Sequence, residues 1–536
     1  MAADLPAQGA APAPWWQRGV VYQVYPRSFA DTDGDGVGDL EGVRRRLDHL
    51  EWLGIDAIWL SPIFRSPMAD FGYDVTDYTD VDPVFGSLDD LDRLVADAHD
   101  RGIRVILDWV PNHTSDQHPW FVESRSSRDN PKRDWYVWRD GSASAGPPND
   151  WSSAFVEPAR WERDPTTREL RRVRAQTPGV EHRGTAWTFD ETTGQWYLHL
   201  FLPEQPDLDW RTPEVESAMH DVLRFWLDRG IDGFRADVVH MIGKDVGAQL
   251  ATIPQSDIGE GATVHAILRR IRTLLDGYHD DRMMVGEVFI LDPTEMAKFY
   301  GDSDELHLSF NFAPLFTRWD ARRWRERVIE SERVVTPAVG WPTWVLSNHD
   351  VVRHADRYGS EGRARAAAVL LLTLRGTPFL YAGEELGLLD AVVPPDRVVD
   401  PGGRDGCRAP IPWTRDERHG WGDEAWLPFP PDASARSLEA QRDDPTSILH
   451  LYRRLLAARR ASPALQVGEL TVLDAPDGVL AWDRVAGGDH RRILVNFTED
   501  HLAVAGLSGG WAIDVSTHDA FDGTLRPDEA VILRRP

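Results

Sequence analysis

The sequence is almost free of cysteine and has no long apolar run. Cys407 is the single cysteine among 536 residues, which excludes a disulfide within one chain and favours a reducing compartment, so we expect a cytoplasmic protein. No run of about 18 apolar residues occurs, which argues against a membrane-spanning helix. Residues 1–14 lack the basic start and apolar centre of a signal peptide, and we expect them to form a flexible tail.

Positive charge is also scarce. The chain has 59 Lys and Arg residues against 87 Asp and Glu residues, a formal net charge of −28. Such acidity disfavours nucleic acid and anionic membranes as partners and suits small neutral substrates. An apolar content of 42% and 23 tryptophans exclude a disordered chain. Whether the protein is a monomer or a homo-oligomer stays open.

A glycine-rich phosphate loop after the first strand is missing, which argues against a doubly wound sheet. Apolar strands alternate instead with amphipathic helices, and this rhythm predicts a parallel sheet with helical crossovers. We predict eight strands, at residues 19–26, 55–60, 104–110, 233–239, 283–288, 306–312, 343–349 and 378–383. Helices are expected near 213–229, 262–277, 320–335 and 362–374. The expected fold is therefore an α/β protein with a (β/α)8 TIM barrel.

The barrel rhythm is interrupted twice. We expect residues 15–112 and 206–460 to form the barrel, with an irregular inserted domain at 113–205 and a long excursion at 388–440 after the last strand. Residues 461–536 carry short alternating runs and predict a C-terminal antiparallel β-sandwich domain.

Three predicted strands end in carboxylates: Asp237, Glu287 and Asp350. The carboxyl ends of parallel barrel strands converge, so these side chains should share one pocket. The cluster lacks cysteine and zinc-type spacing, but two close carboxyl groups suit retaining cleavage of a glycosidic bond. Arg235, two residues before Asp237 on the same strand face, can hold that carboxylate ionised.

An acidic loop follows the first strand. Oxygen ligands recur at positions 1, 3, 5, 7 and 9 of a calcium-type loop, supplied by the side chains of Asp31, Asp33, Asp35 and Asp39 and the carbonyl of Val37. Gly36 stands at the sharp turn, but position 12 is Gly42 rather than a bidentate Glu. We expect a structural Ca²⁺ or Mg²⁺ here; the alternative is an acidic turn loop without an ion.

Several motifs in this order resemble the α-amylase family, glycoside hydrolase family 13, and within it the α-glucosidase and oligo-1,6-glucosidase branch. The similarity runs from about residue 15 to the end of the chain. The motifs are Asp108-Trp-Val-Pro-Asn-His113, Gln205-Pro-Asp-Leu-Asp209, Gly233-Phe-Arg-Ala-Asp237, Gly286-Glu-Val288, Ser347-Asn-His-Asp350 and Gly376-Thr-Pro-Phe-Leu-Tyr-Ala-Gly-Glu-Glu385. The resemblance implies a retaining exo-α-glucosidase of short, neutral α-glucoside oligosaccharides, with no organic cofactor.

The resemblance also implies roles for single residues. Asp237 becomes the nucleophile, Glu287 the general acid/base and Asp350 the carboxylate that stabilises the transition state. Sugar-binding residues are expected at Tyr73, Asp74, His113, Arg235, Val238 and His349. An arginine after the eighth strand, Arg404 or its neighbour Arg408, is expected to meet Asp74 and close the pocket around one glucose.

Some alternatives stay open. In the branch that this chain resembles, Val after the nucleophile accompanies α-1,6 cleavage and Thr accompanies α-1,4 cleavage, so Val238 implies α-1,6 cleavage with α-1,4 activity retained. A glucosyl transferase or sucrose isomerase of the same family would share all three carboxylates, and a non-catalytic binding subunit is a third hypothesis. A basic insert near 157–184 is unusual for the branch and suggests a pocket cover, a self-association surface, an anion contact or a solvated loop; its arginines are Arg160, Arg163, Arg168, Arg171, Arg172 and Arg174.

Overall fold

The computed structural model describes most of the chain. The described residues are 13–149, 151–155, 159–163, 170–174, 184–244, 262–336, 339–422, 424–518 and 520–536. The predicted tail and much of the basic insert, including Arg168, lie outside these ranges. Among the described residues, none of the helices has both the length and the apolar character that crossing a membrane requires.

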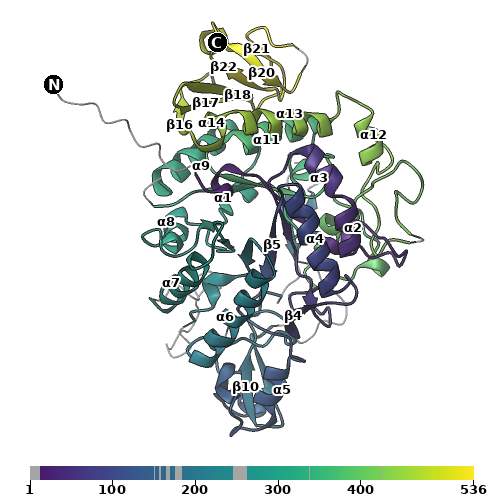
Figure 1. The fold of residues 1–536 in the computed structure, drawn as a ribbon, viewed down its shortest axis with the longest axis vertical. Coiled ribbons are helices and arrows are strands. Elements are labelled where there is room, and N and C mark those ends of the chain that lie inside the picture. Colours follow the sequence, from purple (N-terminus) through teal and green to yellow (C-terminus); the bar gives the residue numbers. More distant parts are fainter. Residues whose placement is uncertain are drawn as a thin grey trace, which may run out of the picture.

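Eight parallel strands form the centre of the molecule (Figure 1). They are β1 (Val21–Val24), β2 (Ala57–Leu60), β5 (Arg104–Trp109), β11 (Gly233–Ala236), β12 (Met283–Gly286), β13 (Leu308–Ser309), β14 (Thr343–Val345) and β15 (Thr377–Tyr381). Their hydrogen-bonded order is β13-β12-β11-β5-β2-β1-β15-β14. The predicted TIM barrel is confirmed, and all eight predicted strands are present, although several are shorter than expected.

The gap between β13 and β14 is bridged by one hydroxyl group. Thr343 Oγ1 donates to the carbonyl of Ser309 at 2.8 Å and accepts from the backbone N–H of Asn311 at 3.1 Å. Thr343 is fully buried. Its side chain therefore supplies hydrogen bonds where these two short strands have no ladder of their own.

Helices cover the outside of the barrel. The main ones are α2 (Leu40–Arg45), α3 (Leu47–Leu53), α4 (Leu88–Asp100), α6 (Pro213–Asp228), α7 (Ala262–Asp276), α9 (Ala321–Val334), α11 (Glu361–Thr373) and α13 (Ile448–Ala461). Apolar residues at helical spacing face the strands, as Leu91, Leu94, Val95 and Ala98 do on α4. Thr212, predicted to cap α6, makes no cap hydrogen bond; its hydroxyl donates to the carbonyl of Asp134.

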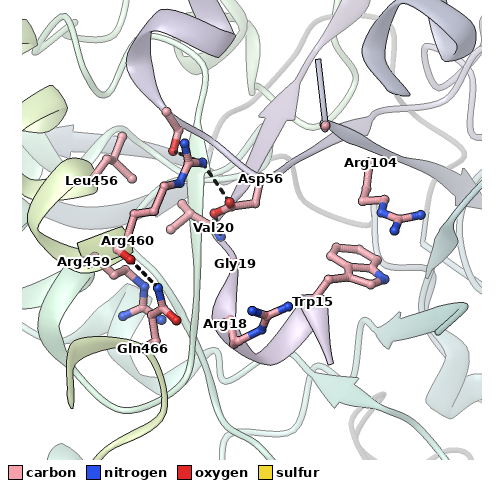
Figure 2. A pocket seen from close by; sticks show the side chains of 12 residues that line it. Trp15, Arg18, Gly19, Val20, Asp56, Arg104, Leu456, Arg459, Arg460 and Gln466 are labelled. Atoms are coloured by element: carbon pink, nitrogen blue, oxygen red, sulfur yellow. Dashed lines mark hydrogen bonds and ion pairs between the residues drawn. The ribbon is translucent and has the colours of Figure 1, made fainter. Parts of the chain in front are cut away.

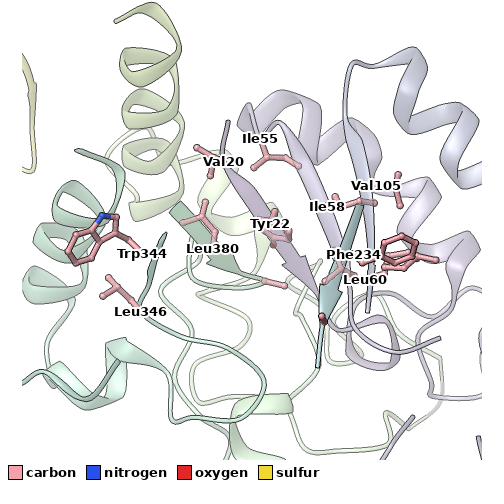
Figure 3. Close-up of a cluster of buried hydrophobic side chains, with 14 of the residues drawn as sticks. Val20, Tyr22, Ile55, Ile58, Leu60, Val105, Phe234, Trp344, Leu346 and Leu380 are labelled. Atoms are coloured by element: carbon pink, nitrogen blue, oxygen red, sulfur yellow. The ribbon is translucent and has the colours of Figure 1, made fainter. Parts of the chain in front are cut away.

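Buried aliphatic and aromatic side chains fill the space between strands and helices. Figure 3 shows part of this core, where Val20, Tyr22, Ile58 and Leu380 come from neighbouring strands. Alternate strand residues point into the barrel interior, where Val21, Trp59, Ile106 and Phe379 belong to a second buried cluster. Both faces of the sheet are therefore dry, as a parallel sheet requires.

Two smaller units flank the barrel (Figure 1). The insert contains α5 (Pro119–Ser126) and a three-stranded sheet of β6 (Trp138–Asp140), β10 (Gln195–Leu198) and β9 (Trp187–Asp190). Part of the basic insert forms an antiparallel hairpin of β7 (Ala159–Arg163) and β8 (Leu170–Arg174). The C-terminal sheet is antiparallel, in the order β16 (Glu469–Leu473), β17 (Val479–Ala486), β18 (Asp489–Asn496), β22 (Ala530–Arg534) and β20 (Ala512–Ser516). The exact domain boundaries stay predictions.

Candidate active site

Arg235 lies at the centre of a buried carboxylate cluster. The register of β11 on β5 places it opposite Asp108. Its Nη1 donates to Asp108 Oδ1 at 2.7 Å and to Asp237 Oδ1 at 2.6 Å. Its Nη2 donates to Glu287 Oε2. One guanidinium group therefore joins carboxylates from the ends of three neighbouring strands.

Exposure separates Asp108 from the three carboxylates that were predicted to react. The side chain of Asp108 is fully buried, whereas those of Asp237, Glu287 and Asp350 are 9%, 13% and 30% exposed. Asp108 also accepts from Trp59 Nε1 at 3.2 Å. The three predicted acids are therefore open to solvent, while Asp108 contacts Arg235 from the buried side.

The cluster holds more carboxylates than cations. Burial raises the pKa of Asp108 to about 7, against the pull of Arg235. Burial also raises the pKa of Asp237, and its contact with Arg235 opposes that shift. One guanidinium group faces three carboxylates, and burial of this cluster favours the protonated forms of Asp108 and Asp237. Such a site can present one ionised and one protonated carboxyl group together.

Asp350 sits in a strongly positive environment. Its Oδ1 accepts from Arg404 Nη1 at 3.0 Å and from Arg408 Nη2 at 3.2 Å. His349 Nε2 lies 3.3 Å from its Oδ2. Burial acts to raise the pKa of Asp350, but these three neighbours outweigh it and hold the pKa below its usual range. Asp350 is therefore ionised near neutral pH.

Arg404 meets Asp70 rather than the predicted Asp74. Its Nη2 donates to Asp70 Oδ1 at 2.5 Å and also bonds Asp400. The carboxylate of Asp74 is fully buried and accepts from Ser66 Oγ and from the backbone N–H groups of Ala69 and Asp70. The predicted contact between Arg404 and Asp74 is therefore wrong, because Asp74 is occupied in shaping its own loop.

Arg408 is more deeply placed than Arg404. It is fully buried, and its Nε donates to the carbonyl of His349 at 2.8 Å. Contacts of Asp400 with Arg404 and Arg408 outweigh the effect of burial and lower the pKa of Asp400 to about 2. Arg408 and Asp400 thus support Arg404 from the protein side.

Tyr73 is stacked on His349 with ring centroids 5.6 Å apart and an interplanar angle of 8°. Its hydroxyl lies 2.5 Å from His349 Nε2 and 3.1 Å from Asp108 Oδ2. Burial lowers the pKa of His349 to about 3, so the ring is neutral at physiological pH. On its other side, His349 Nδ1 lies 2.7 Å from Gln23 Nε2.

His113 belongs to the same wall of the site. Its Nε2 lies 3.0 Å from the carbonyl of Tyr73 and 3.1 Å from Gln205 Nε2. Gln205 also donates to Asp70 Oδ2 at 3.2 Å. Burial lowers the pKa of His113 to about 4, so it too is neutral near pH 7.

Val238 ends β11 earlier than predicted. It adopts φ +34°, a left-handed conformation that β-branched residues rarely take, so the strand stops at Ala236 instead of continuing to residue 239. The Val238 N–H donates to Glu287 Oε2 at 3.2 Å. Backbone strain of this kind is characteristic of functional sites, and here it places Val238 directly beside the predicted acid/base.

Several contributors to the site were not predicted. Asp70 and Asp400 bind Arg404, Gln23 contacts His349, and Trp59 binds Asp108. Gln205 begins the motif Gln205-Pro-Asp-Leu-Asp209, so that motif already indicated it as a candidate site residue. Asp400 precedes the arginine loop in sequence, but nothing in the spacing indicates that it turns back onto Arg404.

An apolar rim lies beside Glu287. Phe289, two residues further along the chain, is 40% exposed and lies 5.0 Å from the ring of Phe312. Phe316, also 40% exposed, lies 6.2 Å from Phe289. These phenylalanines were not predicted as site residues.

The acidic loop partly matches the predicted cation site. Ligand oxygens of Asp31, Asp33 and Asp39 lie within 4.8 Å of one another, and oxygen-only donors of this type suit Ca²⁺ or Mg²⁺. Asp35 lies outside this group; its Oδ1 accepts from the N–H of Val37 at 2.8 Å. The predicted set of five ligands therefore reduces to a triad of carboxylates that can hold an ion.

Comparison with known proteins identifies relatives across nearly the whole chain. The family described as "Alpha amylase, catalytic domain" matches residues 23–468. The "Probable alpha-glucosidase" of Rhizobium meliloti (strain 1021) is 39% identical over 528 residues, covering 91% of this chain and 90% of the relative. The "Oligo-1,6-glucosidase" of Parageobacillus thermoglucosidasius is 34% identical, covering 90% and 91%.

Solved structures give the same fold. An alpha-glucosyl transfer enzyme, XgtA, superposes with a TM-score of 0.86 at 37% identity, covering 98% of this chain and 100% of the other. The isomaltulose synthase SmuA from Protaminobacter rubrum superposes with a TM-score of 0.86 at 30% identity and the same coverage.

Proposed function

This chain belongs to the α-amylase family and is a glycoside hydrolase of the α-glucosidase type, and we propose that it is a retaining, exo-acting α-glucosidase of short oligosaccharides. The observation that carries this proposal is the single guanidinium group of Arg235, which contacts both Asp237 and Glu287. Two carboxyl groups on one guanidinium fork have the short separation, about 5 Å, that double displacement needs.

In the proposed first step, an Asp237 oxygen attacks the anomeric carbon of the terminal glucose. The bond to the leaving oxygen breaks as Glu287 transfers its proton to that oxygen. In the second step Glu287 removes a proton from water, the water oxygen bonds the anomeric carbon, and the bond to Asp237 breaks. Two inversions give net retention. The contact with Arg235 favours the ionised form of Asp237, the form that attacks the anomeric carbon.

The proposed sugar pocket takes one glucose unit. Asp350 and Asp70 are joined by Arg404, so two carboxylates and an arginine form one ordered surface for sugar hydroxyl groups. Tyr73 offers its ring, and His113 and His349 offer neutral ring nitrogens. We propose that this wall closes the pocket and restricts the enzyme to non-reducing ends.

The proposed Ca²⁺ or Mg²⁺ would be held by Asp31, Asp33 and Asp39. Its contribution there would be the charge that three close carboxylates need, with no part in the reaction. Asp39 Oδ1 also accepts from the N–H of Gly42 at the start of α2. An ion on this loop would therefore stabilise the connection between β1 and the first barrel helices.

We propose α-1,6 cleavage with α-1,4 activity retained, on the basis of Val238. Its backbone contacts Glu287, and its side chain is 7% exposed, so a branched apolar group borders the place where the leaving sugar departs. Relatives named oligo-1,6-glucosidase and glucan 1,6-alpha-glucosidase are compatible with this preference.

Glucosyl transfer or sucrose isomerisation is a second candidate, favoured by one observation. Phe289, two residues after Glu287, and its neighbour Phe316 form an exposed apolar surface. An apolar rim binds an acceptor in place of water, and relatives of this chain include a transfer enzyme and an isomaltulose synthase. This candidate keeps the same covalent intermediate and differs only in what attacks it.

Asp237→Asn tests the nucleophile. We expect kcat to fall on the order of 10⁴-fold without loss of folding, because an amide cannot form the glycosyl ester. Asp221→Asn, an exposed acid on α6, serves as the control and should retain full activity. Activity of Asp237→Asn within tenfold of the parent would disprove the assignment.

Product analysis then separates the two candidates. Purified enzyme is given maltose, isomaltose and sucrose at equal concentration, and products are followed by NMR. Release of α-glucose, fastest from isomaltose, supports the proposed hydrolase. New disaccharides from sucrose would favour the second candidate, and faster release from maltose would remove Val238 as the determinant of linkage.

A further inference from the structure

A second cavity opens at the end of the barrel opposite the active site. It has a volume of about 480 Å³ and lies where β2 and β5 begin, between the N-terminal helix α1 (Trp15–Arg18) and the C-terminal helices α13 and α14 (Pro463–Val467) (Figure 2). This size lies within the range of small-molecule sites. Because catalytic residues of such barrels lie at the carboxyl ends of the strands, this cavity is separate from the catalytic pocket.

The lining is strongly cationic in a chain whose net charge is −28. Four arginines line the cavity, Arg18, Arg104, Arg459 and Arg460, against a single carboxylate, Asp56. In Figure 2, Arg459 and Arg460 lie on one side and Arg104 on the other. The local charge is therefore opposite in sign to that of the whole protein.

Two of these arginines already have counterions. Arg460 Nη2 donates to Asp56 Oδ1 at 2.8 Å, and Arg104 Nη1 donates to Asp232 Oδ1 at 2.8 Å. Asp232 is shared, because Arg282 Nη1 donates to the same oxygen at 2.9 Å. The carboxylates near the cavity thus balance only part of its positive charge.

Arg459 is the unusual member. It is 2% exposed, and its terminal nitrogens donate only to carbonyl groups, those of Leu372, Leu465 and Gly376. Its buried Nε has no hydrogen-bond partner among the described residues. A buried cation without a contacting anion is costly, and an anion in the cavity would relieve that cost.

Arg18 and Trp15 complete the lining from α1. The side chain of Arg18 is exposed and makes no hydrogen bond or ion pair with another described residue. The half-buried Trp15 donates from Nε1 to the carbonyl of Asp281 at 2.9 Å, which fixes its ring at the edge of the cavity. The site thus combines an unpaired guanidinium group with an aromatic surface.

We propose that this cavity binds a small phosphate ester, such as a sugar phosphate, with its phosphate on the arginines and its organic part against Trp15. Guanidinium groups match phosphate oxygens in geometry and charge, and the volume exceeds what inorganic phosphate fills. The ligand would connect α1, the base of the barrel and the helices that lead into the C-terminal sheet. It acts as a stabiliser, distant from the catalytic carboxylates.

Ribose 5-phosphate is a suitable probe, because it is not a glucoside. We expect a saturable rise in Tm of the full-length protein, larger than with inorganic phosphate and absent with ribose or with sodium chloride at matched ionic strength. Activity on isomaltose should keep its KM. No saturable rise with ribose 5-phosphate would overturn the proposal, and an equal rise with inorganic phosphate would overturn the assignment to an ester.

A charge-reversal variant of Arg18 tests whether ribose 5-phosphate binds in this cavity. Arg18→Glu should weaken ribose 5-phosphate binding in calorimetry at least tenfold, and Arg18→Lys should retain most of it. Arg322→Glu, which places the same change on the exposed surface of α9, is the matched control and should bind like the parent. The Arg18 side chain makes no hydrogen bond or ion pair with another described residue, so the variant should fold, and normal glucosidase activity will show this. Equal binding by Arg18→Glu and Arg322→Glu would refute this location.

Discussion

Asp70 and Asp74 lie four residues apart in one loop, yet their carboxylates have different surroundings. Asp70 contacts Arg404 and Gln205, whereas Asp74 binds only groups of its own loop. We predict that Asp70→Asn lowers kcat/KM for isomaltose about 10²-fold, because it weakens a charge-assisted contact in the sugar pocket. Steady-state kinetics of Asp70→Asn and of Asp74→Asn on isomaltose measures this loss.

Asp74→Asn should lower the stability of the protein more than its activity. Burial raises the pKa of Asp74 to about 6, and its carboxylate is held by three hydrogen bonds. The Asn variant keeps one oxygen of the two, so we expect a lower Tm and less than a tenfold loss of kcat/KM. A larger kinetic loss in Asp74→Asn than in Asp70→Asn would restore the original prediction for Asp74.

We predicted Asp74 as the partner of Arg404, but Arg404 contacts Asp70. This difference shows why the contacts of single residues are hard to predict. Met68 and Phe71 adopt φ +66° and +48°, unusual for residues other than glycine, and they turn the loop so that Asp70 faces Arg404. The sequence offers two acids beside Tyr73 and no periodic signal to choose between them. Asp237, Glu287 and Asp350 were easier to predict as site residues, because each follows an apolar strand in a parallel barrel.

At the scale of elements, the acidic loop makes a prediction about metal. Chelation should lower Tm by about 2–3 °C, since a ligand at 100 times its Kd contributes about 2.7 kcal/mol. The effect should vanish in Asp33→Asn and persist in Asp35→Asn, because only Asp33 belongs to the clustered triad. A thermal melt with EDTA and with added Ca²⁺ measures this. Loss of the response in Asp35→Asn as well as in Asp33→Asn would favour the original five-ligand arrangement.

The closure of the barrel depends on another element-scale feature. Thr343→Val keeps the shape of the side chain but removes the hydroxyl group that serves Ser309 and Asn311. Leaving two buried backbone groups unsatisfied should lower the free energy of unfolding by about 1–3 kcal/mol. Thr471→Val on the exposed surface of β16 is the control, with a change within about 0.5 kcal/mol. Urea denaturation of both variants tests the role of this hydroxyl, and equal stabilities would disprove it.

Element order followed from the sequence because apolar strands and amphipathic helices differ in period. The ends of the strands could not be predicted from the sequence in the same way, and β13 shows why. Residues 306–312 read as one apolar strand, but only Leu308–Ser309 pairs with a neighbour. Beyond it Phe310 and Phe312 are buried in the cluster inside the barrel without extending the strand ladder, a tertiary effect that no local pattern expresses.

For the whole molecule, burial of titratable groups sets two opposing dependences of stability on pH. Burial lowers the pKa of His113, His118 and His240 to about 4 and that of His349 to about 3. The unfolded chain binds these protons at about pH 6.5, so acidification below that pH favours unfolding. Burial also raises the pKa of Asp108 and Asp390 to about 7, which favours the folded state on acidification. The two contributions therefore partly cancel in the pH dependence of the free energy of unfolding.

Replacing His118 isolates the contribution of one histidine to the pH dependence of stability. His118 caps α5 by accepting from the N–H of Trp120, and Asn can keep that cap without titrating. Between pH 6.5 and 4 the parent loses about 1.4 kcal/mol per pH unit through His118, and His118→Asn does not. The stability of the variant relative to the parent should therefore rise by about 2–3 kcal/mol from pH 7 to pH 4. Urea unfolding across this range measures the difference, with the exposed His518→Asn as control. A constant difference at all pH values would mean that His118 is protonated in the folded protein, which its dry surroundings oppose.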